Sequence, residues 1–160
     1  MASRHTLMVV WISLLIGLLL AVFPMPYEWL WWRPEFIALL VIYWVLHMPQ
    51  RLGVGFAFIV GLFQDIVCWT PWGQHALALM VVAYMCQLGY QRILSYGILQ
   101  QSFWVFVLVG IHQLVANWTH TLSGHAAEGL VFLVPAVLSG CLWPGVNVLL
   151  GGIERHYRMG

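Results

Sequence analysis

The chain has 160 residues, of which 62% are hydrophobic and only 7% are charged. A soluble domain is roughly 45–50% apolar and about 25% charged, so a soluble fold of this size could not cover itself with so few charges. The six Lys and Arg side chains and the net charge of +1 leave no basic patch for nucleic acid. The composition excludes an ordinary cytosolic enzyme, a disordered tail and a nucleic-acid binder, and it is typical of an integral membrane protein.

Long charge-free runs predict membrane-spanning helices, because one span needs roughly 20 apolar residues. The runs are continuous and lack the ten-residue alternation of a membrane barrel, so helices are the remaining way to pair every backbone group in lipid. We therefore expect one membrane domain over residues 1–160, folded as an all-α bundle of six transmembrane helices. The expected helices are Leu7–Phe23, Trp29–Met48, Gly53–Trp69, His75–Gln91, Ser102–Thr119 and Leu130–Leu150.

Two segments near the N-terminus admit more than one interpretation. The first apolar run resembles a signal peptide, but Pro24-Met25-Pro26-Tyr27 follows it without a small-x-small cleavage pattern, so we expect a retained anchor helix. Segment 24–35 is either the start of the second helix or a short interfacial helix, because its tryptophans are typical of the headgroup region.

The arginines predict the orientation of the bundle. With the N-terminus inside, a single arginine, Arg33, faces outward. This bias favours an even number of spans with both termini in the cytoplasm. The inward arginines are Arg4, Arg51, Arg92, Arg155 and Arg158. All of them except Arg4 are also expected to touch anionic lipid headgroups.

The third expected helix has the most informative pattern. Gly53, Ala57, Gly61 and Asp65 recur every four residues and so share one helix face. The three small residues predict a groove against which another helix packs closely, and a helix of another protein is one candidate. A carboxyl group in a membrane helix is costly, so Asp65 either faces protein and has a partner or marks the water-exposed helix end.

Other polar residues are expected at the same outer depth. Gln113, Asn117 and His120 have i, i+4, i+7 spacing on the fifth helix, His75 begins the fourth, and Arg33 lies in the first outer loop. We therefore expect an outward polar cluster of Arg33, Asp65, His75 and Asn117. Arg33 is the first candidate as charge partner of Asp65, and His75 is the second.

No motif for catalysis or metal binding stands out. The chain lacks HExxH, GxSxG and P-loop patterns, so we expect no catalytic residue. Seven histidines are many, but no ligand-type spacing singles any of them out, so we expect no metal and no cofactor.

Two functions remain open on these observations. One is a small-molecule-binding membrane subunit of a transporter, with a pocket beside the outer cluster and a last helix kinked by Pro135 and Pro144. The other is a membrane scaffold that grips another protein through the groove of small residues and the polar cluster.

A series of short motifs resembles the rod shape-determining MreD family of Gram-negative bacteria. They cover about Arg33–Leu79, a third of the chain, and their order and spacing are more specific than any one of them. The motifs are Arg33-Pro34-Glu35-Phe36, Tyr43-Trp44, Pro49-Gln50-Arg51-Leu52-Gly53-Val54-Gly55, Gly61-Leu62-Phe63-Gln64-Asp65 and Gly73-Gln74-His75-Ala76-Leu77-Ala78-Leu79.

The resemblance implies an inner-membrane component of the machinery for lateral cell-wall synthesis. Its implied partners are MreC and, through it, the actin-like MreB, the glycosyltransferase RodA and the elongation transpeptidase. It also implies a fold similar to the substrate-binding subunits of energy-coupling-factor transporters, and no catalytic residue. The motif positions single out Arg33, Pro34, Asp65, Gly73 and His75 as structural or partner-contact residues.

Overall fold

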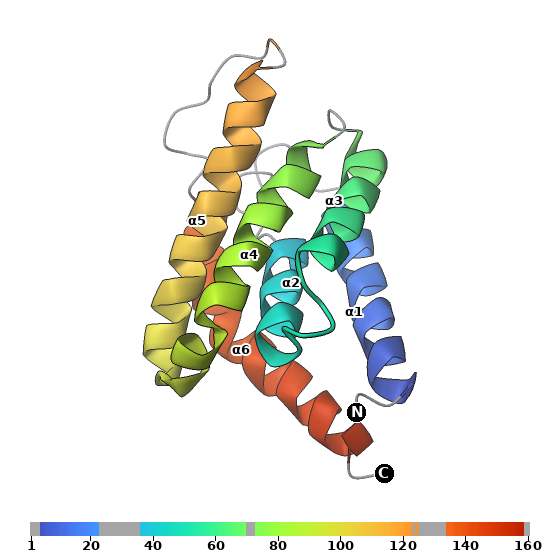
Figure 1. Ribbon diagram of the computed structural model, residues 1–160, viewed down its shortest axis with the longest axis vertical. Helices are drawn as coiled ribbons and strands as arrows, with labels where there is room; N and C mark the ends of the chain where they lie inside the picture. The colour runs from blue at the N-terminus through green and yellow to red at the C-terminus, as the bar shows by residue number, and fades with distance from the viewer. Residues whose placement is uncertain (1–3, 23–35, 70–72, 123, 125–133, 159–160) are drawn as a thin grey trace.

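The structure, a computed structural model, describes residues 4–22, 36–69, 73–122, 124 and 134–158. Within these residues it is entirely helical and has no strand, which confirms the expected all-α, six-helix architecture (Figure 1). The helices are α1 (Arg4–Val22), α2 (Phe36–His47), α3 (Val54–Cys68), α4 (Gln74–Ser95), α5 (Ile98–Leu122) and α6 (Val134–Arg158).

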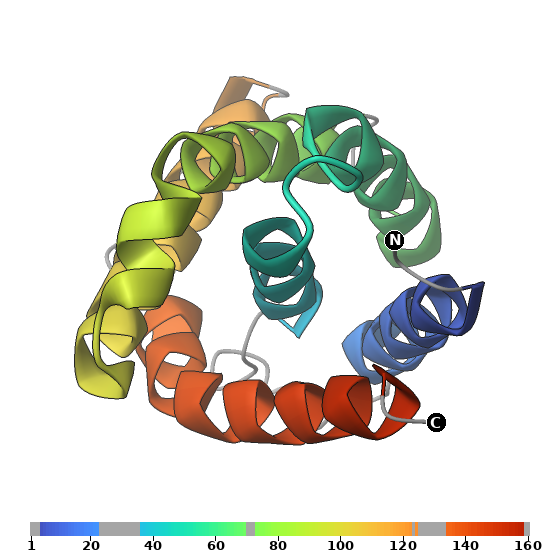
Figure 2. The same ribbon diagram turned by 60° about the horizontal axis from the view of Figure 1, so that its bottom comes forward.

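Helix α2 forms the centre of the bundle. In Figure 2 it stands inside a ring formed by the other helices of the described residues. Nine of its twelve residues are buried, and Tyr43 and Trp44 are among the largest fully buried side chains. The helix is apolar all round, which is the pattern of a helix with no face toward water. Its apolar sequence is therefore consistent with its buried position.

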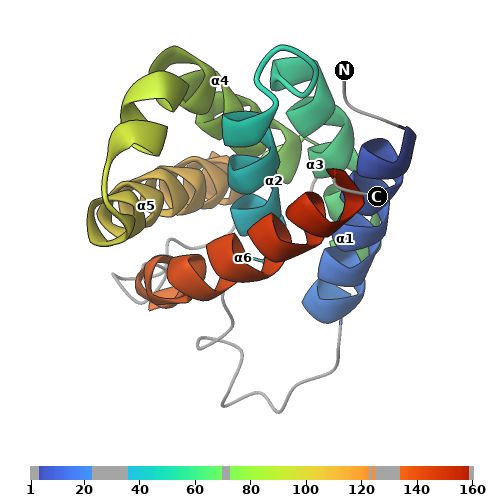
Figure 3. The ribbon, with the colours of Figure 1, turned by 90° about the horizontal axis from the view of Figure 1, so that it is seen from below.

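The outer ring closes in the order α1, α3, α4, α5 and α6, with α6 returning to α1. Figure 3 shows α6 crossing beside α2, with its C-terminal part next to α1. Two side-chain hydrogen bonds tie α2 to this part of the ring. Trp44 Nε1 donates to Ser13 Oγ on α1 at 3.0 Å, and Tyr43 Oη donates to Glu154 Oε2 on α6 at 3.1 Å.

Several helix bounds differ from those expected. α4 continues to Ser95, and α6 continues to Arg158 instead of stopping near Leu150. Pro135, expected inside the last helix, is the second residue of α6, where a missing N–H costs nothing; only Pro144 lies inside the helix. α2 is described from Phe36, and segment 24–35, with its two interpretations, lies outside the described residues.

The lengths and charges of the helices suit a membrane. α4, α5 and α6 are long and apolar enough to cross a bilayer, and α1, α2 and α3 contain shorter apolar stretches. Many large apolar side chains on the outer helices are exposed, including Leu15, Phe63 and Leu114. The start of α1, the connection from α2 to α3 and the ends of α4 and α6 lie at one end of the bundle (Figure 1). These segments hold Arg4, Arg51, Arg92 and Arg155. We call this end the arginine end.

Candidate functional site

A buried carboxyl group lies at the other end of the bundle, where α3 meets α4. Asp65 is only 1% exposed, although it is one turn from the C-terminus of α3. Its Oδ2 accepts hydrogen bonds from the backbone N–H of Gly73 at 2.9 Å and of Ala76 at 3.4 Å. Its Oδ1 accepts one from the backbone N–H of His75 at 2.9 Å. The environment of Asp65 is therefore a set of backbone donors.

These donors are the first N–H groups of α4. A helix leaves its first N–H groups without partners inside the helix, and a side chain at the N-cap usually accepts from them. The N-cap of α4 is Gly73, which has no side chain to offer. Asp65 supplies the acceptor from the preceding helix, and its negative charge also suits the positive end of the α4 dipole. The favourable position explains how a carboxyl group is tolerated in the interior of the bundle.

Gly73 is required by the backbone geometry of this turn. Its φ of 95° lies in the left-handed region, which a residue with a Cβ adopts only at a cost. In this turn the N–H of Gly73 donates a hydrogen bond to Oδ2 of Asp65. The resemblance singled out Gly73 as a motif position, and the structure gives the physical reason for a glycine there.

The ring of His75 completes the site. Its Nδ1 lies 2.8 Å from Oδ1 of Asp65 and donates to it in the tautomer that carries the proton on Nδ1. The ring of His112, on α5, lies beside it with 5.9 Å between the ring centroids, and His112 is 1% exposed. A carboxyl group and two imidazoles thus link α3, α4 and α5. We call Asp65, Gly73, His75 and His112 the outer polar site, because the sequence predicts that this end of the bundle faces outward.

The sequence predicted part of this site. It placed Asp65 and His75 together, with His75 as the second candidate partner. Arg33 and Pro34 lie outside the described residues. Asn117 lies elsewhere on α5, in a shallow hollow of about 440 Å³ lined with Leu114, Val115, Trp118 and Thr121. Among the described residues, no hydrogen bond joins Asn117 to Asp65.

His112 is not among the predicted site residues, because the polar spacing of Gln113, Asn117 and His120 marks a different face of α5. Val105, Val109, His112 and Ala116 are buried and follow i, i+4, i+7, i+11 spacing. This buried stripe is the signal that could have placed His112 in the bundle interior.

The groove of small residues on α3 is occupied by the chain itself. A Cβ on Gly61 would lie 2.3 Å from Cα of Ala76, and one on Gly53 would lie 2.2 Å from Nε2 of Gln87. Ala57, between them, is fully buried. The face therefore packs against α4, which corrects the expectation that it is open to a helix of another protein. This close packing brings α3 near enough to α4 for Asp65 to accept hydrogen bonds from the backbone of α4.

Three side-chain amides near the site each have one buried atom without a hydrogen-bond partner among the described residues. The atoms are Oε1 of Gln64, Oε1 of Gln74 and Nε2 of Gln113. These glutamines are neighbours in sequence of Asp65, His75 and His112, so this end of the bundle is polar beyond the site itself. The described residues contain no group of three or more His, Cys, Asp or Glu side chains placed to hold a metal ion.

Comparison with known proteins identifies the family. The family of the rod shape-determining protein MreD matches residues 3–152. The chain belongs to the MreD family. The rod shape-determining protein MreD of Haemophilus influenzae (strain ATCC 51907 / DSM 11121 / KW20 / Rd) is 29% identical over 148 residues, which cover 90% of this chain and 89% of that protein.

Membership in the MreD family confirms the resemblance found in Arg33–Leu79 and extends it to nearly the whole chain. It supports a role in cell shape and agrees with the apolar helices of a membrane protein. No solved structure matches the chain. The expected likeness to the substrate-binding subunits of energy-coupling-factor transporters therefore stays a prediction, as does a role of the outer polar site in partner binding.

Proposed function

We propose that this chain is a non-catalytic, multi-pass scaffold of the cell-wall elongation complex in the bacterial inner membrane. In this role it binds MreC and so helps to position peptidoglycan synthesis, with MreB, RodA and the elongation transpeptidase as indirect partners. Both termini lie in the cytoplasm. Membership in a rod shape-determining family supports the role in shape, and the gathering of arginines at one end supports the orientation.

The observation that carries this proposal is the filled centre of the bundle. Side chains of α2 from Ile37 to Leu46 pack against the surrounding helices, and most of them are fully buried. A solute crossing the middle of the described bundle would have to displace this helix. A solid bundle with an apolar outer surface favours a scaffold over the alternative, a small-molecule-binding subunit of a transporter.

The outer surface offers several faces to a membrane helix of MreC. Because the small-residue face of α3 is taken by α4, the partner helix is expected on a lipid-facing side of the ring. Exposed side chains there include Leu15 on α1, Phe63 on α3, Leu114 on α5 and Val148 on α6. Association of helices in lipid relies on close packing, since the hydrophobic effect gives no advantage between surfaces already in an apolar solvent.

In-membrane photo-crosslinking tests the proposal. A photoreactive residue is placed in turn at Leu15, Phe63, Leu114 and Val148 in cells that contain MreC. Ile42, which is fully buried in α2, is the matched control. We expect an adduct with MreC from at least one exposed position and none from Ile42. If every exposed position gives no adduct and MreC does not co-purify with the chain, the scaffold proposal fails.

A further inference from the structure

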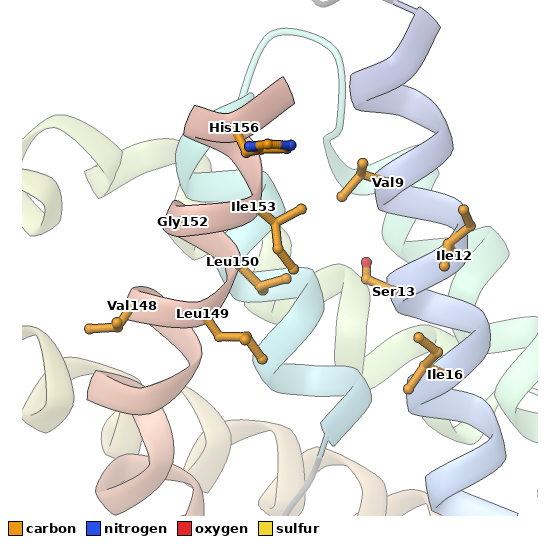
Figure 4. Close-up of a pocket in the computed structure, with 10 residues that line it drawn as sticks. All are labelled: Val9, Ile12, Ser13, Ile16, Val148, Leu149, Leu150, Gly152, Ile153 and His156. Carbon is orange, nitrogen blue, oxygen red and sulfur yellow. The ribbon is translucent and has the colours of Figure 1, made fainter. Parts of the chain in front are cut away.

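An apolar groove separates α1 from α6 at the arginine end. Its volume is about 710 Å³, and Figure 4 shows the side chains of both helices lining it. Its walls include Val9, Ser13 and Ile16 on α1 and Val148, Gly152 and His156 on α6. Apart from the hydroxyl of Ser13 and the ring of His156, the side chains that line the groove are hydrocarbon. Gly152 contributes only its backbone.

Both walls of the groove are attached to the central helix. Trp44 bonds to Ser13 on α1, and Tyr43 bonds to Glu154 on α6. The hydroxyl of Ser13 also donates to the backbone oxygen of Val10 at 2.7 Å, so its polarity is satisfied within the chain. The interior of the groove is therefore apolar in effect, and its two walls are fixed relative to α2.

The length of the groove fits one leaflet of a bilayer. From Val9 to Ile16 the rise along α1 is about 10 Å, and from Val148 to His156 the rise along α6 is about 12 Å. Half of the hydrocarbon core is about 15 Å thick, whereas a membrane-spanning helix needs about 30 Å. The groove suits an acyl chain of the leaflet at the arginine end better than a helix that spans the bilayer.

Basic side chains lie on α1 and α6 near the end of the groove that is closest to the arginine end of the bundle. His156 lines the groove, and the exposed Arg155 lies beside His156 on α6. Arg4 and His5, also exposed, begin α1 at the same end of the bundle. The nearby acid, Glu154, is half-buried and accepts a hydrogen bond from Tyr43 on the inner side of α6. Arg155 does not line the groove, but it is exposed and adjacent to His156 in sequence, so its positive charge complements a phosphate group that lies beside His156.

We propose that the groove between α1 and α6 is a binding site for an anionic phospholipid. An acyl chain fills the apolar groove, and the phosphate lies against Arg155 and His156. Such a lipid fills the groove between α1 and α6 and couples the chain to anionic regions of the inner leaflet. This inference does not depend on MreC binding, because it rests on the groove and the basic side chains near its end.

Gly152 provides a selective way to close the site. It lines the groove, and a Cβ on it would meet no atom within 4 Å. Gly152→Leu therefore fills the groove without a clash at its Cβ. Gly145→Leu is the matched control, because Gly145 lies two turns away on the same helix, also has open space and does not line the groove.

The test uses the full chain, delipidated in detergent and offered dioleoyl phosphatidylglycerol or dioleoyl phosphatidylcholine, with retention measured by native mass spectrometry. We expect wild type and Gly145→Leu to prefer phosphatidylglycerol by about tenfold. Gly152→Leu should retain neither lipid. The double variant Arg155→Gln, His156→Gln should bind both lipids equally. Helicity and the unfolding temperature are compared first, so that a misfolded variant is recognised.

Three results would overturn the proposal. One is equal retention of the two lipids by wild type, and another is undiminished retention of phosphatidylglycerol by a folded Gly152→Leu protein. The third is an MreC adduct from Val148 that disappears in Gly152→Leu, which would assign the groove to a protein helix. The first two results leave the scaffold proposal intact, and the third supports it, so the two proposals fail separately.

Discussion

Asp65 and His75 are joined twice, because Oδ1 of Asp65 accepts from both the backbone N–H and the ring Nδ1 of His75, at 2.9 and 2.8 Å. The pair fastens the end of α3 to the start of α4. The pair lies at the end of the bundle opposite the arginines. The ring of His112 on α5 lies beside that of His75 there. The stability of the contact between the end of α3 and the start of α4 therefore depends on one carboxyl group.

Asp65→Asn is expected to lower the free energy of unfolding by about 2–3 kcal/mol, because hydrogen bonds to a charged acceptor are among the strong ones. An asparagine would direct an NH₂ group toward N–H donors that Asp65 satisfies. The measurement is thermal or denaturant unfolding of the purified protein in detergent. Asn117→Ala, away from the cap, is the control and should change the free energy by less than about 0.5 kcal/mol. Equal stability of Asp65→Asn and wild type would refute the capping role.

Gly61→Ala is expected to destabilise the protein by about 1–3 kcal/mol, since the new methyl group would be forced against the backbone of Ala76. Gly55→Ala, on the same helix, is the matched control because its Cβ would meet nothing within 4 Å. Alanine has the higher helix propensity, so Gly55→Ala should be neutral or more stable by up to about 1 kcal/mol. Unfolding curves of the two variants, recorded side by side, should separate in opposite directions. Equal curves would mean that α3 and α4 do not pack closely at Gly61.

Gly73→Ala should cost about 1–2 kcal/mol through the backbone alone, because φ at this position is 95°. Space around the side chain is not the cause, since a Cβ at Gly73 would meet no atom within 4 Å. Gly97→Ala is the control, as Gly97 has equally open surroundings without a positive φ. A Gly73→Ala protein that unfolds at the same temperature as Gly97→Ala would show that the turn tolerates another conformation.

Tyr43→Phe tests the attachment of α6 to the central helix. The substitution removes the hydrogen bond to Glu154 and keeps the ring that stacks on His47, with 4.1 Å between centroids. The expected loss is about 1 kcal/mol of unfolding free energy. Limited proteolysis near the C-terminal part of α6 should also become faster. Unchanged cleavage together with unchanged stability would contradict the role assigned to this bond.

Much of the fold could be predicted from the sequence because lipid imposes strong rules. Charge-free runs predicted six helices. The positions of the arginines predicted that the start of the first helix and the end of the last lie at the same end of the bundle. The central place of α2 was not predicted, although its residues from Phe36 to His47 are apolar on every side. In a membrane protein most helices look apolar, so the pattern that marks burial in a soluble protein loses its power to discriminate.

The site could be predicted only in part, for a similar reason. Spacing along α3 showed that Gly53, Ala57, Gly61 and Asp65 share a face, but spacing does not identify the helix opposite that face. Helices that follow one another in sequence tend to be neighbours, and α4 is the neighbour here. The contact with His112 depends on the rotation of α5, which the polar residues of that helix did not indicate.

Cell shape during depletion of the chain tests the proposed scaffold most directly. A rod-shaped host is depleted of the protein while its length-to-width ratio and the sites of new wall synthesis are followed by microscopy. The account predicts that cells round up and that lateral synthesis is lost, with both restored by a wild-type copy of the gene. Cells that stay rod-shaped, or that stop growing until a vitamin is supplied, would contradict the scaffold and favour a transport subunit.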